Sequence, residues 1–164
     1  MLYTKGMLKD ILKELDLWVQ KENTHRRSRG ALLLPKTTIQ ILGQTALLEA
    51  KLEIELVGTV DIDAYIEGDF VVRKQFDELL QKRGRHLDSD SEKIWMPPET
   101  DYHLFFQGQS VDGFLAHPDD VLISKALKAP DRNRSLIISY LSQGASQKFL
   151  KLAQKYHLDL KRFL

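Results

Sequence analysis

The sequence predicts a single α+β domain with a C-terminal helical subregion. Its 164 residues are enough for one domain with one substantial core, and 43% hydrophobic with 29% charged residues is ordinary for a globular protein. Candidate strands dominate the centre of the chain and helical periodicities both ends, without an internal repeat. We therefore expect one domain over 1–164, made of an N-terminal helix and basic loop (1–36), a core of strands and helices (37–116) and C-terminal helices (117–164).

The N-terminal region predicts an amphipathic helix over residues 6–22. Residues 23–30 are polar, basic and turn-like, so we expect a loop there that either contacts phosphates or is simply exposed to solvent. Residues 32–35 form a short apolar run that ends at a proline, typical of a strand or a buried connection. The helical prediction depends on apolar side chains that recur at spacings of three and four, namely Met7, Leu8, Ile11, Leu12, Leu15 and Trp18.

The central region predicts alternating short strands and helices. Gly68 and Asp69 indicate a turn, and Gly84 is a candidate cap for the end of a helix. The expected elements are, in order, a strand (37–42), a glycine turn (43–45), a short helix (46–52), one or two strands (53–66), a helix (71–82), a polar loop (88–92) and three short strands (93–96, 102–106 and 110–116).

The C-terminal region predicts three helices. Pro118 suits the first helical position, and the acidic residues after it suit a first turn, so a helix should begin there and stop before Pro130. Asp131 is expected to cap a second helix that ends near Gly144. A last helix carries Phe149 and further apolar residues at helical spacing.

Several classes of protein are excluded by what the sequence lacks. There is no cysteine, so there is no disulfide framework or thiolate chemistry, and the five histidines are too scattered for a zinc site. No apolar run is long enough to span a membrane, and residues 1–6 lack the apolar core of a signal peptide. No glycine-rich phosphate loop or nucleophile elbow occurs. We expect a cytoplasmic protein without membrane partners.

Charge is unevenly distributed although the net charge is only +1. Residues 49–101 hold 14 acidic and 7 basic side chains, whereas residues 1–48 hold 4 acidic and 8 basic, and residues 102–164 hold 5 acidic and 9 basic. This polarity suits an acidic, cation-binding centre between basic regions that hold a polyanion. Charge alone favours the simpler interpretation, that these side chains cover solvated surfaces.

The acidic centre contains a pair of carboxylates on a predicted strand. Alternation along a strand places Asp61 and Asp63 on one face, with Val60, Ile62 and Ala64 on the other. Two neighbouring carboxylates repel each other unless a cation lies between them, so the pair is a candidate Mg²⁺ site. A glycine turn precedes the pair, and Asp101 follows it just before another predicted strand.

Together these residues resemble the pattern of the nucleotidyltransferase superfamily over roughly residues 38–142. The superfamily has a helix-opening Gly-Gly or Gly-Ser, which Gly43-Gln44 resembles, then an Asp-x-Asp strand, which Asp61 and Asp63 match, and a third carboxylate on a neighbouring strand, for which Asp101 is the candidate. The segment 117–128, with its Ser-Lys pair, is similar to a helix of small bacterial members, including the abortive-infection toxin type. The resemblance implies a mixed sheet flanked by helices, with 37–116 as its catalytic core.

The resemblance also implies a two-metal reaction on a nucleoside triphosphate such as ATP. Asp61 and Asp63 would hold two Mg²⁺ ions and Asp101 would complete the metal site. The triphosphate would be bound by the backbone and hydroxyl of the turn residues Gly43, Gln44 and Thr45, and by Lys125. Gln44 departs from the pattern, because its longer side chain stands where a small residue is usual.

The implied function is transfer of a nucleotidyl group to RNA, such as the end of a transfer RNA, or to a protein hydroxyl. In toxin-type relatives this activity belongs to toxin–antitoxin or phage-defence systems, so an antitoxin partner is expected. Lys128, Arg132 and Arg134 are candidates for binding the acceptor. Two alternatives stay open: a catalytically degenerate relative that binds nucleotide, RNA or a partner protein, and a metal-dependent nuclease.

Overall fold

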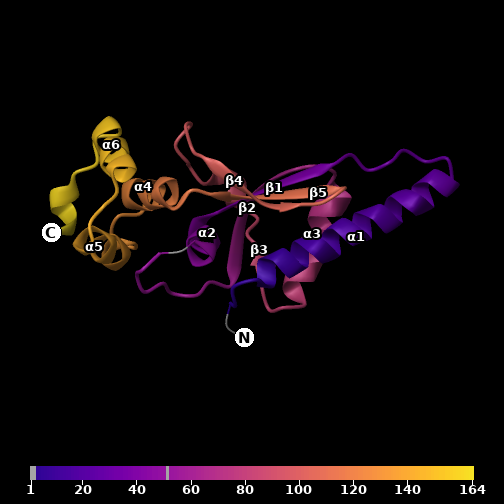
Figure 1. Cartoon of the computed structure of the whole chain (residues 1–164), viewed down its shortest axis with the longest axis horizontal. Coiled ribbons are helices and arrows are strands. Elements are labelled where there is room, and N and C mark those ends of the chain that lie inside the picture. The colour runs from indigo at the N-terminus through magenta and orange to yellow at the C-terminus, as the bar shows by residue number, and fades with distance from the viewer. Residues whose placement is uncertain (1–2, 51) are drawn as a thin grey trace.

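The computed structural model describes residues 3–50 and 52–164 and has an α+β architecture around one mixed sheet (Figure 1). The five strands lie in the order β3-β2-β1-β5-β4. Strand β1 pairs antiparallel with β2 and parallel with β5, β2 pairs parallel with β3, and β4 pairs antiparallel with β5. The strands are β1 (Thr37–Leu42), β2 (Asp61–Glu67), β3 (His86–Leu87), β4 (Tyr102–Gln107) and β5 (Val111–Ala116).

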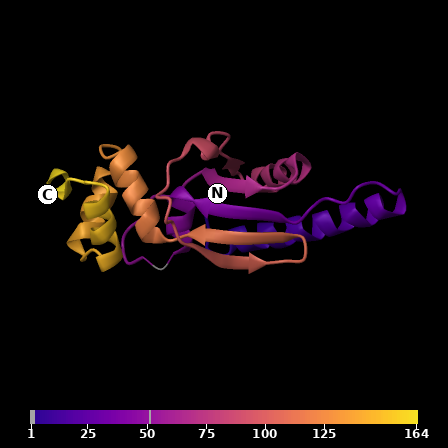
Figure 2. The ribbon, with the colours of Figure 1, turned by 90° about the horizontal axis from the view of Figure 1, so that it is seen from above.

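Helices cover the sheet and extend it at one end. Helices α1 and α3 lie side by side along the sheet, whereas α4, α5 and α6 gather at the end marked by the C-terminus (Figures 1 and 2). Helix α2 follows β1 directly and contacts α4, so it joins the two regions. The helices are α1 (Met7–Ser28), α2 (Gly43–Glu49), α3 (Phe70–Gln81), α4 (Pro118–Lys128), α5 (Arg134–Ser142) and α6 (Gln147–Lys155), with 3-10 turns η1 (Ser91–Lys93) and η2 (Leu160–Phe163).

One hydrophobic core runs through the sheet and its helices. Alternate residues of the two central strands, including Ile39, Ile41, Ile62 and Ala64, are fully buried. The predicted apolar stripe of the first helix is buried from Met7 to Val19, and one face of α3 is buried too. Because strand alternation puts Ile62 and Ala64 in this core, Asp61 and Asp63 emerge on the other side of β2, as the sequence predicted.

The first helix is longer than the sequence suggested. Residues 23–28, predicted as part of a loop, continue α1 to Ser28. Arginine and glutamate favour helix, and Glu22 pairs with Arg26 one turn later at 3.1 Å. The helix ends where Gly30 takes a positive φ of 67° and the Ala31 N–H bonds the Arg26 carbonyl.

The segment between the first two strands also differs from the prediction. Helix α2 starts at Gly43, inside the predicted turn, and ends at Glu49. Of residues 53–66, only those from Asp61 onward form a strand. Strand β1 already has partners on both sides, β2 and β5, so no place beside it is left for a further strand.

The predicted strand over 93–96 is wrong. It is replaced by η1 and an irregular stretch whose carbonyl groups accept hydrogen bonds from side chains: Tyr65 donates to Ile94 and Ser124 donates to Trp95. The two prolines that follow also oppose a continuing ladder. The cap predicted at Asp131 is displaced to Asn133, because residues 131–133 form a turn before α5 begins at Arg134.

The remaining elements confirm the sequence analysis. The strands predicted at 37–42, 102–106 and 110–116 are β1, β4 and β5 within one residue at each end. Pro118 opens α4, with Asp119 and Asp120 in its first turn. No helix within residues 3–50 and 52–164 is long and apolar enough to cross a membrane.

Candidate functional site

The site is built around the close approach of Gly43 to Asp63. Leu42, the last residue of β1, pairs with Asp63 on β2, so the chain turns into α2 directly over that carboxylate. Gly43 has a φ of 64°, and a Cβ at this position would stand 2.3 Å from Oδ2 of Asp63. Only glycine fits both the backbone conformation and the space. The glycine turn therefore holds the backbone against the carboxylate pair.

A cleft of about 330 Å³ opens beside this contact, between the end of the sheet and helix α4 with the turn that follows it. That volume lies in the range of small-molecule sites. Part of its wall is apolar, from Ile94, Met96 and Val121. Seven of the ten residues predicted for the site line the cleft: Gly43, Gln44, Asp61, Asp63, Lys125, Lys128 and Arg132.

The cleft contains a third carboxylate that the sequence analysis missed. Strand β3 runs parallel to β2, and the Asp88 N–H bonds the Ile62 carbonyl at 2.9 Å, which places Asp88 beside Asp63. The sequence analysis put Asp88 in a polar loop, because a two-residue strand shows no periodicity. The signal was its position just after a helix and a glycine, where a returning strand belongs. Thr59, Ser124 and Asn133 also line the cleft and were not predicted.

The surroundings of Asp63 raise its pKa strongly. Burial, a hydrogen bond with Asp88 and the charges of Asp88 and Asp61 together raise the pKa of Asp63 to about 7. The Lys125 ammonium opposes this rise. Near neutral pH a large share of the molecules therefore hold a proton on Asp63, which a bound cation would displace.

The opposite wall of the cleft is basic. Lys125 is half-buried, and its burial lowers its pKa, whereas the charge of Asp63 raises it. Lys128 is exposed, with its Nζ 5.1 Å from the centre of the Trp95 ring. Arg132 follows α4 and lowers the pKa of Lys125 through its charge. The cleft thus places three carboxylates opposite three cations, an arrangement suited to a ligand with both cationic and anionic parts.

Asn133 fixes the turn that carries the basic wall. Its side-chain amide donates to the carbonyl oxygens of Ala129 at 2.9 Å and Lys125 at 3.4 Å. These carbonyls lie at the C-terminal end of α4, where the Lys125 carbonyl also accepts the Ala129 N–H and the Ala129 carbonyl also accepts the Asn133 N–H. The turn is therefore held against the end of the helix that bears Lys125.

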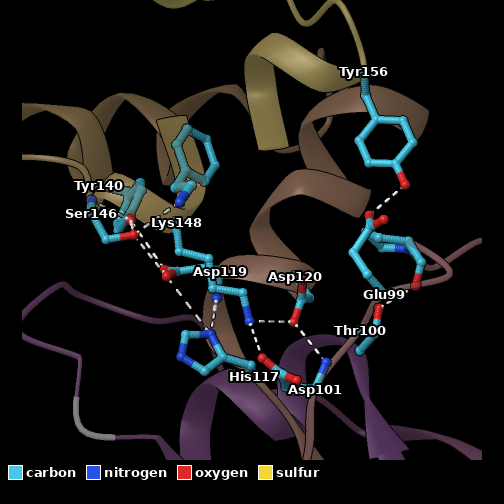
Figure 3. A network of polar contacts seen from close by, with 12 residues as sticks. Glu99, Thr100, Asp101, His117, Asp119, Asp120, Tyr140, Ser146, Lys148 and Tyr156 are labelled. Carbon is cyan, nitrogen blue, oxygen red and sulfur yellow. Dashed lines mark hydrogen bonds and ion pairs between the residues drawn. The ribbon is translucent and has the colours of Figure 1, made fainter. Parts of the chain in front are cut away.

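Three predicted residues lie outside the cleft lining. Asp101 precedes β4, and its exposed carboxylate accepts a hydrogen bond from Lys148 of α6 at 2.8 Å (Figure 3). That hydrogen bond lowers the pKa of Asp101. Thr45 is buried inside α2, and Arg134 donates to the Arg162 carbonyl near the C-terminus. The third carboxylate that lines the cleft is therefore Asp88. Asp101, the residue predicted for that place, belongs to a separate polar network.

Gln44 lines the cleft, but its amide is engaged. The side chain donates from Nε2 to the Val57 carbonyl at 2.8 Å. This bond ties the start of α2 to the segment that leads into β2. The side chain that departs from the superfamily pattern is therefore held by the protein itself.

No group of three or more His, Cys, Asp or Glu side chains in residues 3–50 and 52–164 is arranged to hold a metal ion on its own. The contact between Asp63 and Asp88 nevertheless offers two carboxylates of the kind that bind Mg²⁺. Mg²⁺ sites commonly combine one or two carboxylates with water and substrate phosphates. The residues present fit a metal that arrives with a phosphorylated substrate.

Comparison with protein-family models, curated proteins and solved structures found no match to this chain.

Proposed function

We propose that this chain is an Mg²⁺-dependent nucleotidyltransferase-like enzyme that transfers a nucleotidyl group from a nucleoside triphosphate to RNA or to a protein hydroxyl. The observation that carries the proposal is the meeting of Asp61, Asp63 and Asp88 with Lys125 in one cleft, over the glycine turn. In the superfamily pattern the third carboxylate lies on a strand next to the Asp-x-Asp strand. Asp88, directly after β3, has that position.

The carboxylates would hold the metal and the basic wall would hold the phosphates. Mg²⁺ supplies charge neutralisation and orients phosphate oxygens in reactions of this kind. Asp63 would give up its proton on binding the cation, with Asp88 beside it as a second carboxylate ligand, and Asp61 would add negative charge at the mouth of the cleft. Lys125 would bind the phosphates as a point charge.

The rest of the cleft suits the other parts of a nucleotide. The apolar wall of Ile94, Met96 and Val121 matches the faces of a base or sugar. Lys128 and Arg132 stand at its edge and would bind the outer phosphates or the acceptor. Arg134 is occupied by the Arg162 carbonyl, so we assign the acceptor contact to Lys128 and Arg132.

The test is label transfer from α-labelled nucleoside triphosphates to macromolecules of a bacterial extract in the presence of Mg²⁺. We expect Asp63→Asn and Asp88→Asn each to reduce transfer at least ~100-fold, because each removes a charge from the metal site. Asp101→Asn is the matched control: the same chemical change at a carboxylate outside the cleft should leave transfer within about threefold of wild type.

The outcomes separate the assignments sharply. Loss of transfer in Asp101→Asn with full activity in Asp88→Asn would reverse the choice of third carboxylate. Activity in the double variant Asp61→Asn/Asp63→Asn would refute the whole site. Nicked RNA or DNA without incorporated label would identify a nuclease.

The second candidate is a catalytically degenerate protein of the same fold, and the Gln44–Val57 hydrogen bond favours it. This bond holds the long Gln44 side chain at the start of α2, where the superfamily has a small residue, and so leaves less space there for the triphosphate. This candidate predicts Mg²⁺-dependent nucleotide binding by calorimetry with no label transfer. Restored transfer in Gln44→Ser would show that Gln44 alone blocks the reaction.

A further inference from the structure

We propose that the exposed face of α1 and the adjoining β4–β5 hairpin bind single-stranded RNA. This surface lies apart from the cleft, and RNA binding there does not depend on chemistry in the cleft. It would let the protein hold an RNA whether that RNA is the acceptor of a transfer or a regulator.

The first observation is a basic ridge along α1. Lys9, Lys13, Lys21 and His25 are spaced by multiples of four residues, and all are exposed. Residues four apart are neighbours on a helix surface, so these side chains, with Leu17 among them, form a row that winds gradually around α1 along its length. A helix of 22 residues is about 33 Å long, which matches several nucleotides of extended strand.

The ridge continues onto the free end of the helix. Buried positions in α1 stop at Val19, and the remaining turns project beyond the sheet (Figure 1). Arg27 and Arg29 are exposed there. Asn23 ties this end of the helix to the backbone of Leu34, and Arg29 lies 3.8 Å from Glu22. Arg27 is the cation here with no ion pair among those found in the described residues.

The acidic residues of α1 are mostly engaged by the protein. Glu14 pairs with Arg83, in the turn after α3, at 2.8 Å, and Glu22 pairs with Arg26 at 3.1 Å. Asp16 is buried and accepts the backbone N–H groups of residues 110 and 111 at the start of β5. Of the helix's acidic residues only Asp10 faces solvent without an ion pair among those found, so the potential along the ridge is positive.

The second observation is a shallow groove of about 730 Å³ between α1 and the hairpin. Lys13, Leu17 and Gln20 line its helix side together with Asp16, whose carboxylate is bonded to backbone N–H groups of the hairpin, and Phe106, Gln107 and Gln109 line its hairpin side. Phe106 packs partly against the core, and the part of its ring that lines the groove is available for stacking a base. The two exposed glutamine amides both donate and accept hydrogen bonds, as the ribose 2′-hydroxyl does.

The surface fits RNA better than a lipid membrane. A helix that lies in a membrane interface presents a broad apolar face. Within the part of α1 that the structure describes, Leu17 is the one large hydrophobic side chain classed as exposed. Phosphodiester groups need the spaced cations that the ridge supplies, and no apolar insertion.

The test is fluorescence anisotropy of a labelled oligouridylate long enough to span α1, titrated with the full chain over a series of salt concentrations. EDTA is included so that metal chemistry in the cleft plays no part. The triple variant Lys9→Gln/Lys13→Gln/Lys21→Gln should bind roughly tenfold more weakly, and the slope of log K against log salt should fall in magnitude by about 2.

The matched control changes three exposed lysines elsewhere, Lys74→Gln/Lys151→Gln/Lys161→Gln, and should bind as wild type does. The cleft variant Asp61→Asn/Asp63→Asn should also keep RNA affinity, which separates this proposal from the proposed function. Equal losses of RNA affinity in the two triple variants would overturn the assignment of RNA binding to the ridge. Equal affinity for the deoxy strand would overturn the RNA assignment, and capture by phosphatidylserine vesicles in place of RNA would identify a membrane surface.

Discussion

Gly43 is the residue on which the geometry of the cleft depends most directly. Gly43→Ala must accommodate both a positive φ and a methyl group 2.3 Å from the Asp63 carboxylate. We expect it to lower the free energy of unfolding by roughly 2–4 kcal/mol, measured in urea. The backbone strain of a positive φ and the displacement of the Asp63 carboxylate both contribute to this loss.

Gly84→Ala is the control for backbone strain alone. Gly84 has a φ of 69°, but a methyl group there meets no atom within 4 Å. Its cost should be roughly 1 kcal/mol. Equal costs at the two glycines would mean that the contact with Asp63 contributes nothing.

Asp63 gives the protein a pH-dependent stability of unusual sign. Its folded pKa of about 7 exceeds the ordinary value of 3.8, so the folded state keeps a proton that the unfolded state loses. Stability from this group is therefore complete at low pH and is lost as pH rises from about 4 to about 7. Asp63→Asn should be more stable than wild type by about 1 kcal/mol near pH 8, after allowance for partial solvent exposure, and should show no such gain near pH 4.

Thermal melts at the two pH values test this, with Asp101→Asn as the control that should show no gain at high pH. An advantage of Asp63→Asn that is the same at both pH values would contradict the raised pKa of Asp63. Saturating Mg²⁺ should narrow the difference at high pH, because the cation stabilises the ionised wild type.

At the residue scale the sequence predicted the carboxylate pair but not its partner. Asp61, Asp63 and Lys125 could be found because strand alternation and a helical lysine are local patterns. Asp88 reaches Asp63 only through a parallel pairing of β3 with β2, and such a contact leaves no local trace. Asp101 was chosen because it precedes a clear strand, but that strand lies at the far edge of the sheet.

Helix α6 is attached to the rest of the protein through Lys148. Its ammonium bonds the fully buried carboxylate of Asp120 at 2.9 Å and the exposed carboxylate of Asp101 at 2.8 Å (Figure 3). Lys148→Met would leave Asp120 as an uncompensated buried charge. We expect a loss of about 3 kcal/mol in the free energy of unfolding, measured in urea.

Two further variants identify which carboxylate matters. Asp101→Asn should change the free energy of unfolding far less than Lys148→Met does, because its ion pair is exposed to solvent. Adding Asp120→Asn to Lys148→Met should restore part of the loss, since the buried charge is then gone. No recovery in the double variant would argue that Lys148 acts through packing alone.

Element boundaries were predictable where local chemistry marks them. Pro118 and the acidic turn after it located α4, and alternation located β1 and β5. The end of α1 was missed because a basic, polar segment reads as a loop, although its residues form helix readily. The strand prediction at 93–96 failed because the carbonyl groups of this stretch accept hydrogen bonds from Tyr65 and Ser124. The sequence does not reveal these tertiary contacts.

For the whole molecule, the mixed sheet and its place between helices follow from the order of elements, whereas the strand order does not. The parallel pairing of β1 with β5 brings together segments separated by about half of the chain. That pairing lets α4 follow β5 and pack against α2, and so closes the cleft. The two ends of the molecule thus have different characters, with the charged cleft beside α4 and the free helical end of α1 far along the sheet (Figure 1).

The position of Trp95 lets its fluorescence report on ligand binding in the cleft. The chain has two tryptophans: Trp18 lies on α1, and Trp95 lies beneath Lys128, in edge contact with Tyr156. When an anion draws the Lys128 ammonium away from the indole ring, the emission of Trp95 must change, whereas Trp18 lies on a different element. In a Trp18→Phe variant, Trp95 is the remaining tryptophan, so the intrinsic fluorescence of an unlabelled sample reports whether an anion is bound to Lys128 at the wall of the cleft.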